Sequence, residues 1–267
     1  MQITDVSVII RSAGERTSDL CYELVCQQVP RENVVVINEF PFRKAAQRSF
    51  EIGLELGRPW TLCLDADILL RRNALRTLRT WALEADSNVL YVQGSILDKL
   101  FGRPRRAGPY FHRTSLLPKL LEHMPAEGVS LRPDTDAAMR LESFGYRRFQ
   151  QSLIIAVHEF EQYYRDIYRK AFVHAHKHAE QITNLQSFWE RIAAVDQDYQ
   201  VALWGLRDGQ VFQDTISHDV CRFPRDLSFL LTAQGLREKH ALSTVEMTQW
   251  DVDRLMIEYG QMGRGGI

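Results

Sequence analysis

Short apolar runs alternate with longer segments of helical periodicity through the first hundred or so residues. The apolar runs are rich in β-branched residues, which is typical of strands buried on both faces. The segments between them carry apolar residues every three or four positions, as amphipathic helices do. Strands are therefore predicted at 6–10, 33–40, 60–64 and 88–97. This alternation of strand and helix predicts an α/β domain with a mainly parallel sheet flanked by helices.

The chain changes character after its fourth predicted strand. The segment 99–109, KLFGRPRRAGP, is rich in glycine, proline and arginine and predicts a loop. A short helix over 134–147 and a strand over 153–157 are expected next, and the remainder is mostly helical in pattern. We therefore expect a core over residues 1–160 and a helical C-terminal region over 161–267 that packs on it.

Two aspartates end the third predicted strand. The segment WTLCLDAD places Asp65 and Asp67 directly after an apolar run. Positions i and i+2 of a strand share a face, so both carboxylates can point into one pocket. Ligands of parallel sheets collect beyond the carboxyl ends of the strands, and carboxylate oxygens suit Mg²⁺ or Mn²⁺, which neutralise phosphates. The alternative is a helix cap or turn before ILLRRNAL; the position after a buried strand favours the metal site.

The charge of the chain is nearly balanced. Lys and Arg together number 33 and Asp and Glu 34, which gives a formal net charge of -1. A broad nucleic-acid surface normally shows a clear basic excess, so we expect no nucleic-acid partner. An anionic small-molecule ligand stays open.

The cysteines and the N-terminal segment bear on location. The four cysteines form no C-x-x-C pair and no zinc-like spacing, which favours reduced thiols and a cytoplasmic setting. MQITDVSVII does not have the pattern of a signal peptide. No apolar run reaches the roughly 20 residues that a membrane-spanning helix needs. Peripheral docking on a membrane surface stays open.

Three segments, taken in order, resemble the family 2 glycosyltransferases with the GT-A fold. VSVIIRSAGER resembles the family's first strand and loop, and KAAQRSFEIGLELGRPWTLCLDAD its helix, strand and Asp-x-Asp (DXD) motif. RPDTDAAMRLESFGYRR resembles its acidic motif, and together the three segments cover about the first 160 residues. The resemblance implies a GT-A, Rossmann-like fold. It also implies a hexosyltransferase-like enzyme that moves a sugar, with inversion, from a nucleotide-diphosphate donor to a hydroxyl of a saccharide, lipid-linked or other acceptor.

The resemblance further implies roles for single residues. Asp65 and Asp67 would hold Mn²⁺ or Mg²⁺ on the donor's diphosphate, which offsets the charge of the leaving group. His158 would complete the coordination of the metal, with His218 as a later alternative. Asp134 matches the general base of inverting members, which takes the proton of the attacking hydroxyl. An N-cap at the start of a helix is the alternative role for Asp134.

Other residues are expected to contact the substrates. The donor-binding residues predicted in this way are Arg11, Glu15, Glu39, Lys44 and Asp65. The residues expected to contact the acceptor or a phosphate are Arg103, Arg105, Asp136, Tyr164 and Arg165. The chain departs from the family pattern in two places: Pro133 stands where glutamate is usual, and the second strand ends INEFPFRK in place of Asp-x-Gly-Ser-x-Asp.

A histidine-rich segment, FVHAHKHAE, lies in the helical C-terminal region. On a helix His174 and His178 share a face, and His176 does not. Because no other type of metal ligand is nearby in the sequence, we expect a polar surface face here and not a zinc site.

Two other functions stay open at this point. A sugar nucleotidyltransferase also has alternating strands and helices and metal-binding aspartates, but RSAGERTSDL lacks the Gly-x-Gly of its loop. A catalytically degenerate GT-A domain that only binds a sugar nucleotide or a partner is the third possibility, because Pro133 replaces an acidic residue.

Overall fold

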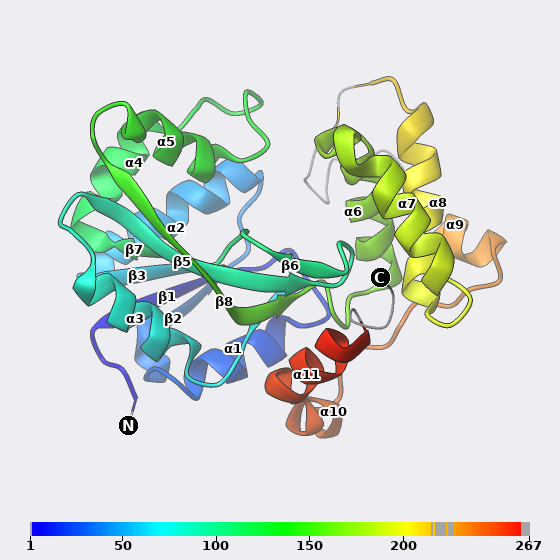
Figure 1. Cartoon of the computed structure of the whole chain (residues 1–267), viewed down its shortest axis with the longest axis horizontal. Helices are drawn as coiled ribbons and strands as arrows, with labels where there is room; N and C mark the ends of the chain where they lie inside the picture. The colour runs from blue at the N-terminus through cyan, green and yellow to red at the C-terminus, as the bar shows by residue number, and fades with distance from the viewer. Residues whose placement is uncertain (1, 215, 217–222, 224–226, 263–267) are drawn as a thin grey trace.

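The computed structural model describes residues 2–214, 216, 223 and 227–262. Both His218 and Cys221 lie outside these residues. The described part of the chain forms two halves, which Figure 1 shows side by side. One half is a twisted sheet covered by helices, and the other is a group of helices that follows the last strand.

The sheet is mixed, and its strands follow the order β2-β1-β3-β7-β5-β8-β4, with β6 paired to β5. Among the described residues, β1, β2, β3, β5 and β8 point in one direction, and β4, β6 and β7 run antiparallel to their neighbours. The α/β fold is confirmed, with an antiparallel strand, β7, inserted between the two parallel groups. The strands are β1 (Val6–Arg11), β2 (Val34–Ile37), β3 (Trp60–Asp65), β4 (Ile68–Leu70), β5 (Val89–Asp98), β6 (Arg103–Arg105), β7 (Tyr110–Arg113) and β8 (Arg147–His158).

Helices cover the sheet and form the second half of the molecule (Figure 1). Those of the first half are α1 (Ser18–Cys26), α2 (Phe42–Leu56), α3 (Ala74–Glu84), α4 (Leu117–His123) and α5 (Pro133–Glu142). Those that follow the sheet are α6 (Tyr164–Lys177), α7 (Ile182–Ile192), α8 (Gln197–Val211), α9 (Leu227–Ala233), α10 (Thr244–Gln249) and α11 (Val252–Met262). None of the described helices is both long enough and apolar enough to cross a membrane.

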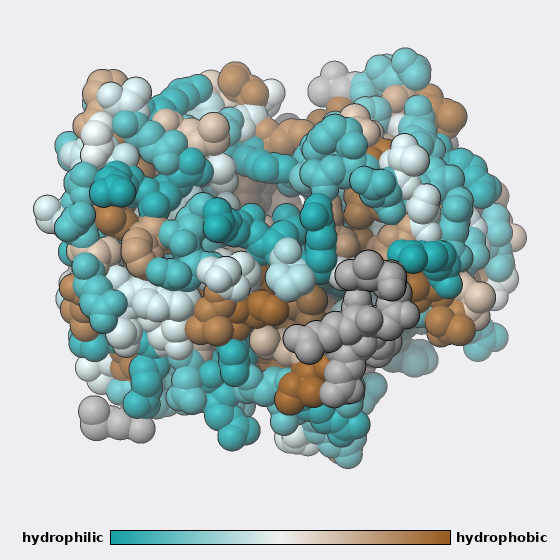
Figure 2. Space-filling model, in the orientation of Figure 1, coloured by the Kyte–Doolittle hydropathy of each residue, from teal (hydrophilic) through white to brown (hydrophobic). Residues whose placement is uncertain are grey.

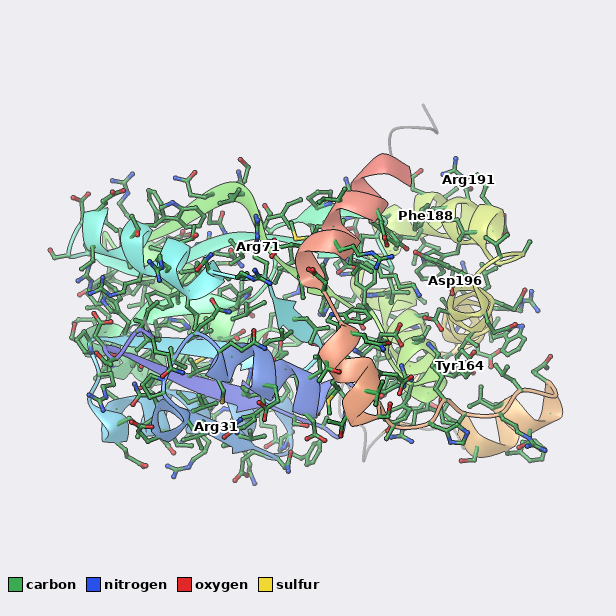
Figure 3. All side chains as sticks on the ribbon, turned by 90° about the horizontal axis from the view of Figure 1, so that it is seen from below. Arg31, Arg71, Tyr164, Phe188, Arg191 and Asp196 are labelled. Carbon is green, nitrogen blue, oxygen red and sulfur yellow. The ribbon has the colours of Figure 1, made fainter. Side chains whose placement is uncertain are left out.

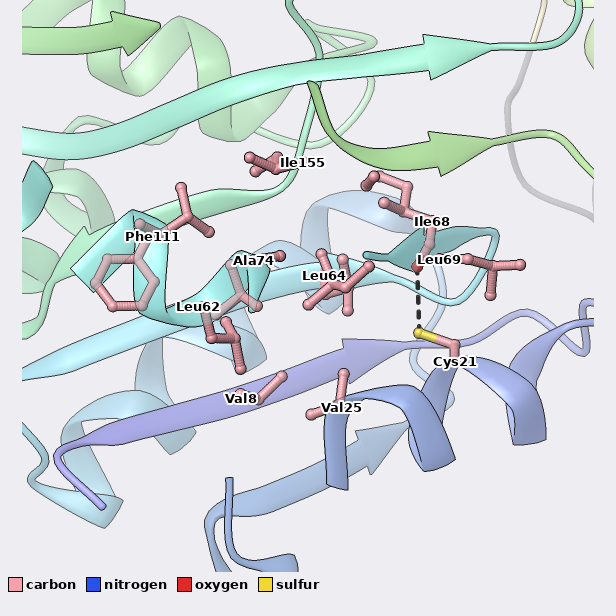
Figure 4. Packing of buried hydrophobic residues seen from close by; sticks show 14 of the residues in the cluster. Val8, Cys21, Val25, Leu62, Leu64, Ile68, Leu69, Ala74, Phe111 and Ile155 are labelled. Atoms are coloured by element: carbon pink, nitrogen blue, oxygen red, sulfur yellow. Dashed lines mark hydrogen bonds between the residues drawn. The ribbon is translucent and has the colours of Figure 1, made fainter. Parts of the chain in front are cut away.

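The core of the sheet half is apolar because the central strands are buried on both faces. Val8, Leu62 and Leu64 are fully buried and pack against α1 and α3 (Figure 4). The thiol of Cys21 donates to the carbonyl oxygen of Ile68 at 3.4 Å, as the dashed line in Figure 4 marks. The three described cysteines are free and buried, which agrees with the expectation of reduced thiols.

The helices of the second half have a core of their own. It is centred on the buried rings of Phe172, Trp189 and Tyr199. Helices α6 and α8 approach closely because α8 presents glycines to α6: a Cβ at Gly205 would fall on the carbonyl oxygen of Tyr168. The position of α6 therefore depends on a backbone contact that only glycine permits.

The C-terminal helices return to the sheet half. Val252 is buried in the core of the sheet, and Arg71 pairs with Asp253 at 2.8 Å. Figure 3 shows Arg71 beside α11. The division into residues 1–160 and 161–267 stays a prediction, and α11 adds a contact across it.

Candidate active site

A cavity of about 540 Å³ lies where the carboxyl ends of β1, β3 and β8 face α6. The loop between β6 and β7 and the start of α5 close its remaining sides. Figure 2 shows the surface hollowed between the part that carries α5 and the part that carries α6. Most of the residues predicted to bind metal or donor line this cavity, as expected for strand ends in an α/β protein.

Arg11 joins two of the predicted functional aspartates at one side of the cavity. It ends β1 and is 6% exposed. Its Nε donates to Oδ1 of Asp65 at 2.7 Å, and its Nη1 donates to Oδ2 of Asp134 at 3.2 Å. Burial alone would lower the pKa of Arg11, but the two carboxylates raise it. Asp65, predicted to bind metal, is thus held by a guanidinium.

Asp134 lies in the first turn of α5, and the N-cap alternative is wrong because the cap position is Arg132. Oδ1 of Asp134 accepts from the backbone N–H of Thr135 at 2.8 Å, and Oδ2 accepts from Arg11. The carboxylate is 6% exposed and lines the cavity. It is therefore oriented by two donors and open to a ligand on one side.

Asp67, His158 and Glu159 form a second acidic group. One ligand atom from each lies within 4.8 Å of the others, as metal coordination requires. Nε2 of His158 lies 3.5 Å from Oδ2 of Asp67 and 3.3 Å from Oε1 of Glu159. Nδ1 of His158 lies 2.8 Å from Oδ2 of the buried Asp98, which turns Nε2 towards the group. A carboxylate behind a histidine is the usual second partner of a metal-binding imidazole.

Glu159 is the residue of this group that the sequence analysis did not identify. It follows β8 and has a φ of 66°, a conformation that costs free energy for any residue except glycine. Such backbone strain is often found at functional sites, and the HEF segment at the end of a strand is the signal that could have indicated it. Its side chain is 3% exposed, and burial raises its pKa.

Lys170 of α6 is the cation of the acidic group. Its Nζ donates to both Asp67 and Glu159. Burial alone would raise the pKa of Asp67, but Lys170 lowers it well below its usual value. Burial alone would lower the pKa of His158, but Glu159 and Asp67 raise it to about 10. Without a metal ion, Lys170 and a protonated imidazole therefore balance the carboxylates.

The donor set fits a divalent cation. Oδ1 of Asp67 is buried and accepts no hydrogen bond from any described residue. With one oxygen each from Asp67 and Glu159 and a deprotonated Nε2 of His158, the group offers the oxygen and imidazole ligands that Mn²⁺ accepts. Asp65 is not part of this group.

The predicted donor-binding residues are only partly brought together. Glu15 lines the cavity and accepts from the backbone N–H of Ala13 at 2.7 Å, and burial together with Asp67 raises its pKa to about 7. Glu39 lines the cavity from the loop after β2 and is exposed. Lys44 is exposed on α2 and does not line the cavity, so it is not placed at the site.

The residues expected to contact the acceptor are mostly elsewhere. Arg105 lines the cavity and pairs with Asp98 at 2.6 Å. Arg103 is exposed and donates to Gln181, away from the cavity lining. The others that do not line it are Asp136 on α5 and Tyr164 and Arg165 at the start of α6. Helix α6 presents Lys170, not its first turn, to the cavity.

The histidine-rich segment is not a surface face. His174 and His178 are each 8% exposed, because their rings pack against Phe101 at centroid distances of 5.4 and 5.2 Å. The expectation of a polar surface is therefore wrong. The burial of these histidines could not be predicted from the sequence, because their partner Phe101 lies in the glycine-rich segment that was predicted to be only a loop.

No protein-family model and no curated protein matches the chain. Among solved structures, it is similar to the mannosyltransferase PcManGT from Pyrobaculum calidifontis in complex with GDP-Man and Mn²⁺, with 14% identity, a TM-score of 0.42, and coverage of 86% of this chain and 79% of that one.

It is also similar to a glycosyltransferase involved in the glycosylation of the major capsid of PBCV-1, with 13% identity, a TM-score of 0.40, and coverage of 58% of this chain and 94% of that one. The CMP:2-keto-3-deoxy-manno-octonic acid synthetase complexed with CTP has 10% identity and a TM-score of 0.40, over 57% of this chain and 90% of that one. These similarities are too distant to assign a residue or a substrate.

Proposed function

We propose that this protein is a metal-dependent, inverting glycosyltransferase that moves a sugar from a nucleotide-diphosphate donor to a hydroxyl acceptor. One observation carries the proposal. A single cavity holds a three-residue metal-ligand group, Asp67, His158 and Glu159, and a separate oriented carboxylate, Asp134. Inverting sugar transfer needs these two functions side by side: a cation for the leaving diphosphate and a base for the incoming hydroxyl.

In this proposal Asp67, Glu159 and His158 hold Mn²⁺ or Mg²⁺. The bound cation supplies charge that stabilises the departing nucleotide diphosphate. Asp98 accepts the Nδ1–H of His158 and so keeps Nε2 turned towards the ligand oxygens. Lys170, which pairs with Asp67 and Glu159, is the residue that a cation displaces from these oxygens.

Asp134 is the proposed base. Its carboxylate accepts the proton of the acceptor hydroxyl as that oxygen attacks the anomeric carbon, and the nucleotide diphosphate leaves with the electron pair of the broken bond. Arg11 holds Asp134 and Asp65 on one guanidinium. We therefore propose for Asp65 a role in fixing Arg11 and the donor, and not a place among the metal ligands.

The test is calorimetry of GDP- and UDP-sugars with and without Mn²⁺, followed by an assay of donor hydrolysis and transfer. We expect Asp67→Ala to weaken metal-dependent binding by about 100-fold or more. Asp134→Asn is expected to keep binding and lower turnover by roughly 10³-fold. Asp136→Asn is the matched control: it makes the same change on the same helix, outside the cavity lining.

Three results would contradict the proposal. If Asp134→Asn retains full turnover, Asp134 is not the base. If the wild-type protein binds the nucleotide sugar but never turns it over, the protein is a binding module. If it releases pyrophosphate from a nucleoside triphosphate and a sugar 1-phosphate, it is a sugar nucleotidyltransferase.

A further inference from the structure

One corner of the cavity carries a set of cations that the proposed mechanism does not use. Arg105, Arg132 and Lys177 all line the cavity, and we call these three residues the basic corner. They come from three separate segments: β6, the residue before α5, and the last residue of α6. Only Arg105 was singled out by the sequence, because the convergence of the other two depends on the tertiary fold.

Aromatic rings lie beside two residues of the basic corner, Arg105 and Arg132. The guanidinium of Arg105 lies over the ring of Phe101, with 4.5 Å from its carbon to the ring centroid. The rings of His174 and His178 pack edge-on against the same Phe101. Nη2 of Arg132 lies 3.5 Å from Nε2 of His178. Arg105 is thus held by packing, and the exposed Arg132 reaches the same aromatic rings through His178.

Among the described residues, only one cation of the basic corner, Arg105, forms an ion pair. Asp98 pairs with Arg105, but no carboxylate of a described residue is within ion-pair distance of Arg132 or Lys177. Burial, Arg132 and Arg105 lower the pKa of Lys177 to about 8, so these cations act on one another. Arg132 is exposed, but Lys177 is half-buried, and a half-buried cation without a counter-ion costs free energy unless a ligand supplies the anion.

A second, independent feature points to a ligand at the same place. Nδ1 of His174 is buried and makes no hydrogen bond with any described residue, although the side chain lines the cavity. A buried polar atom without a partner is uncommon in a folded protein and is costly unless water or a ligand satisfies it. An anionic group with several oxygens would satisfy both the cations and this site.

We propose that the basic corner binds a phosphate group and that this group belongs to the acceptor; the assignment to the acceptor rests on the proposed function. Arginine guanidinium groups and a lysine ammonium group are the side chains that bind phosphate oxygens most strongly. The phosphate is not transferred. It holds the acceptor so that its hydroxyl faces Asp134, which lies two residues after Arg132.

The order of groups along α6 favours the acceptor over the donor as the source of the phosphate. Lys170 donates to Asp67 and Glu159 of the metal-ligand group, where the proposed donor diphosphate binds. Lys177 is seven residues, or two helical turns, further along α6, which corresponds to about 10 Å of helix axis. Lys177 therefore lies beyond the metal-ligand group, where Asp134 acts on its charge. Arg105 lies nearer that group, because it shares Oδ2 of Asp98 with His158.

The experiment titrates inorganic phosphate into the full chain without nucleotide or metal, and separately titrates GDP and UDP with Mn²⁺. We expect Arg132→Gln and Lys177→Gln each to weaken phosphate binding by at least about tenfold, and Lys177→Arg to restore it. Arg140→Gln is the matched control, because Arg140 is an exposed arginine of α5 outside the cavity lining. Nucleotide binding with Mn²⁺ is expected to stay within about twofold in all four variants.

Two results would overturn the proposal. If the wild-type protein does not bind phosphate, or binds it equally after Arg132→Gln and Lys177→Gln, the basic corner is not a phosphate site. If these two variants lose Mn²⁺-dependent nucleotide binding by the same factor as phosphate binding, the phosphate is the donor's. Phosphate binding without any nucleotide binding would support the phosphate site and contradict the proposed function, so the two failures are distinguishable.

Discussion

The two walls of the cavity are built in different ways. The sheet wall presents Arg11 and Asp65 from the ends of neighbouring parallel strands, where a ladder of hydrogen bonds fixes the backbone. The opposite wall, which we call the helical wall, presents Lys170 and Lys177 from α6, and this helix is not part of the sheet. Its position depends on packing against α8 and on the contacts of the helical core. The charged side chains of one site are therefore positioned in two different ways: by hydrogen bonds between strands on one wall, and by packing between helices on the other.

The largest effect is expected from Gly205→Ala, which acts only on the helical wall. The added Cβ would fall on the carbonyl oxygen of Tyr168, so α6 and α8 must separate. We expect a loss of about 3 kcal/mol or more in the free energy of unfolding, measured by urea denaturation. Gln210→Ala, at an exposed position of the same helix, is the control and should cost less than about 0.5 kcal/mol. A loss below about 1 kcal/mol for Gly205→Ala would show that the helical wall adapts easily.

Lys170→Met removes the lysine of α6 that forms ion pairs with Asp67 and Glu159. Asp67 and Glu159 then lose their lysine while staying buried, and breaking such a pair costs about 3 kcal/mol of stability. Mn²⁺ should recover part of this loss, because a cation that binds only the folded state stabilises it. Thermal unfolding with and without Mn²⁺ measures both effects.

The control for this substitution is Lys119→Met, since Lys119 is exposed on α4 and lies over the ring of Tyr146. We expect Mn²⁺ to raise the unfolding temperature of Lys170→Met more than that of the wild type. An equal response would mean that Lys170 and the metal do not compete for the same oxygens.

His112→Phe tests the sheet wall through the pH dependence of the free energy of unfolding. His112 lies on β7 and is buried against Phe50 and Tyr91, and neither ring nitrogen has a hydrogen-bond partner among the described residues. Burial lowers its pKa to about 3; among the charged groups, Asp134 acts to raise it and Arg11 to lower it.

The direction in which stability changes with pH follows from the protonation of His112 in the folded and the unfolded chain. Above about pH 6.5 the imidazole is neutral in both the folded and the unfolded chain, and it makes no pH-dependent contribution. Below that pH the unfolded chain binds a proton that the folded protein does not, so stability falls until about pH 3. Between pH 7 and pH 5 the variant should therefore gain about 2 kcal/mol relative to the wild type. A constant difference at both pH values would show that His112 binds its proton equally in the folded and the unfolded chain, and so contradict the effect of burial.

The sheet wall could be predicted from the sequence, and the helical wall could not. The strand ends that carry Arg11, Asp65 and Asp67 follow from local apolar runs, because a buried strand must end where charge begins. The partners of Lys170 and Lys177 depend on how α6 lies across the sheet, which no local pattern encodes. Glu159 stands beside the predicted His158 and was missed because adjacent residues of a strand face opposite sides. Only the left-handed backbone at Glu159 brings both side chains into one site.

The smallest effect is expected from Tyr259→Phe, which cuts one link between the two halves. The hydroxyl of Tyr259 on α11 lies 2.6 Å from that of Tyr199 on α8, and Tyr199 also donates to the carbonyl oxygen of Lys99 at 2.9 Å. Since Tyr199 keeps that second bond, the variant should lose only about 1 kcal/mol in urea denaturation. Tyr199→Phe removes both bonds and should cost about 2 kcal/mol. If Tyr259→Phe costs as much as Tyr199→Phe, the bond to Lys99 adds nothing to stability and the link through α11 accounts for the whole loss.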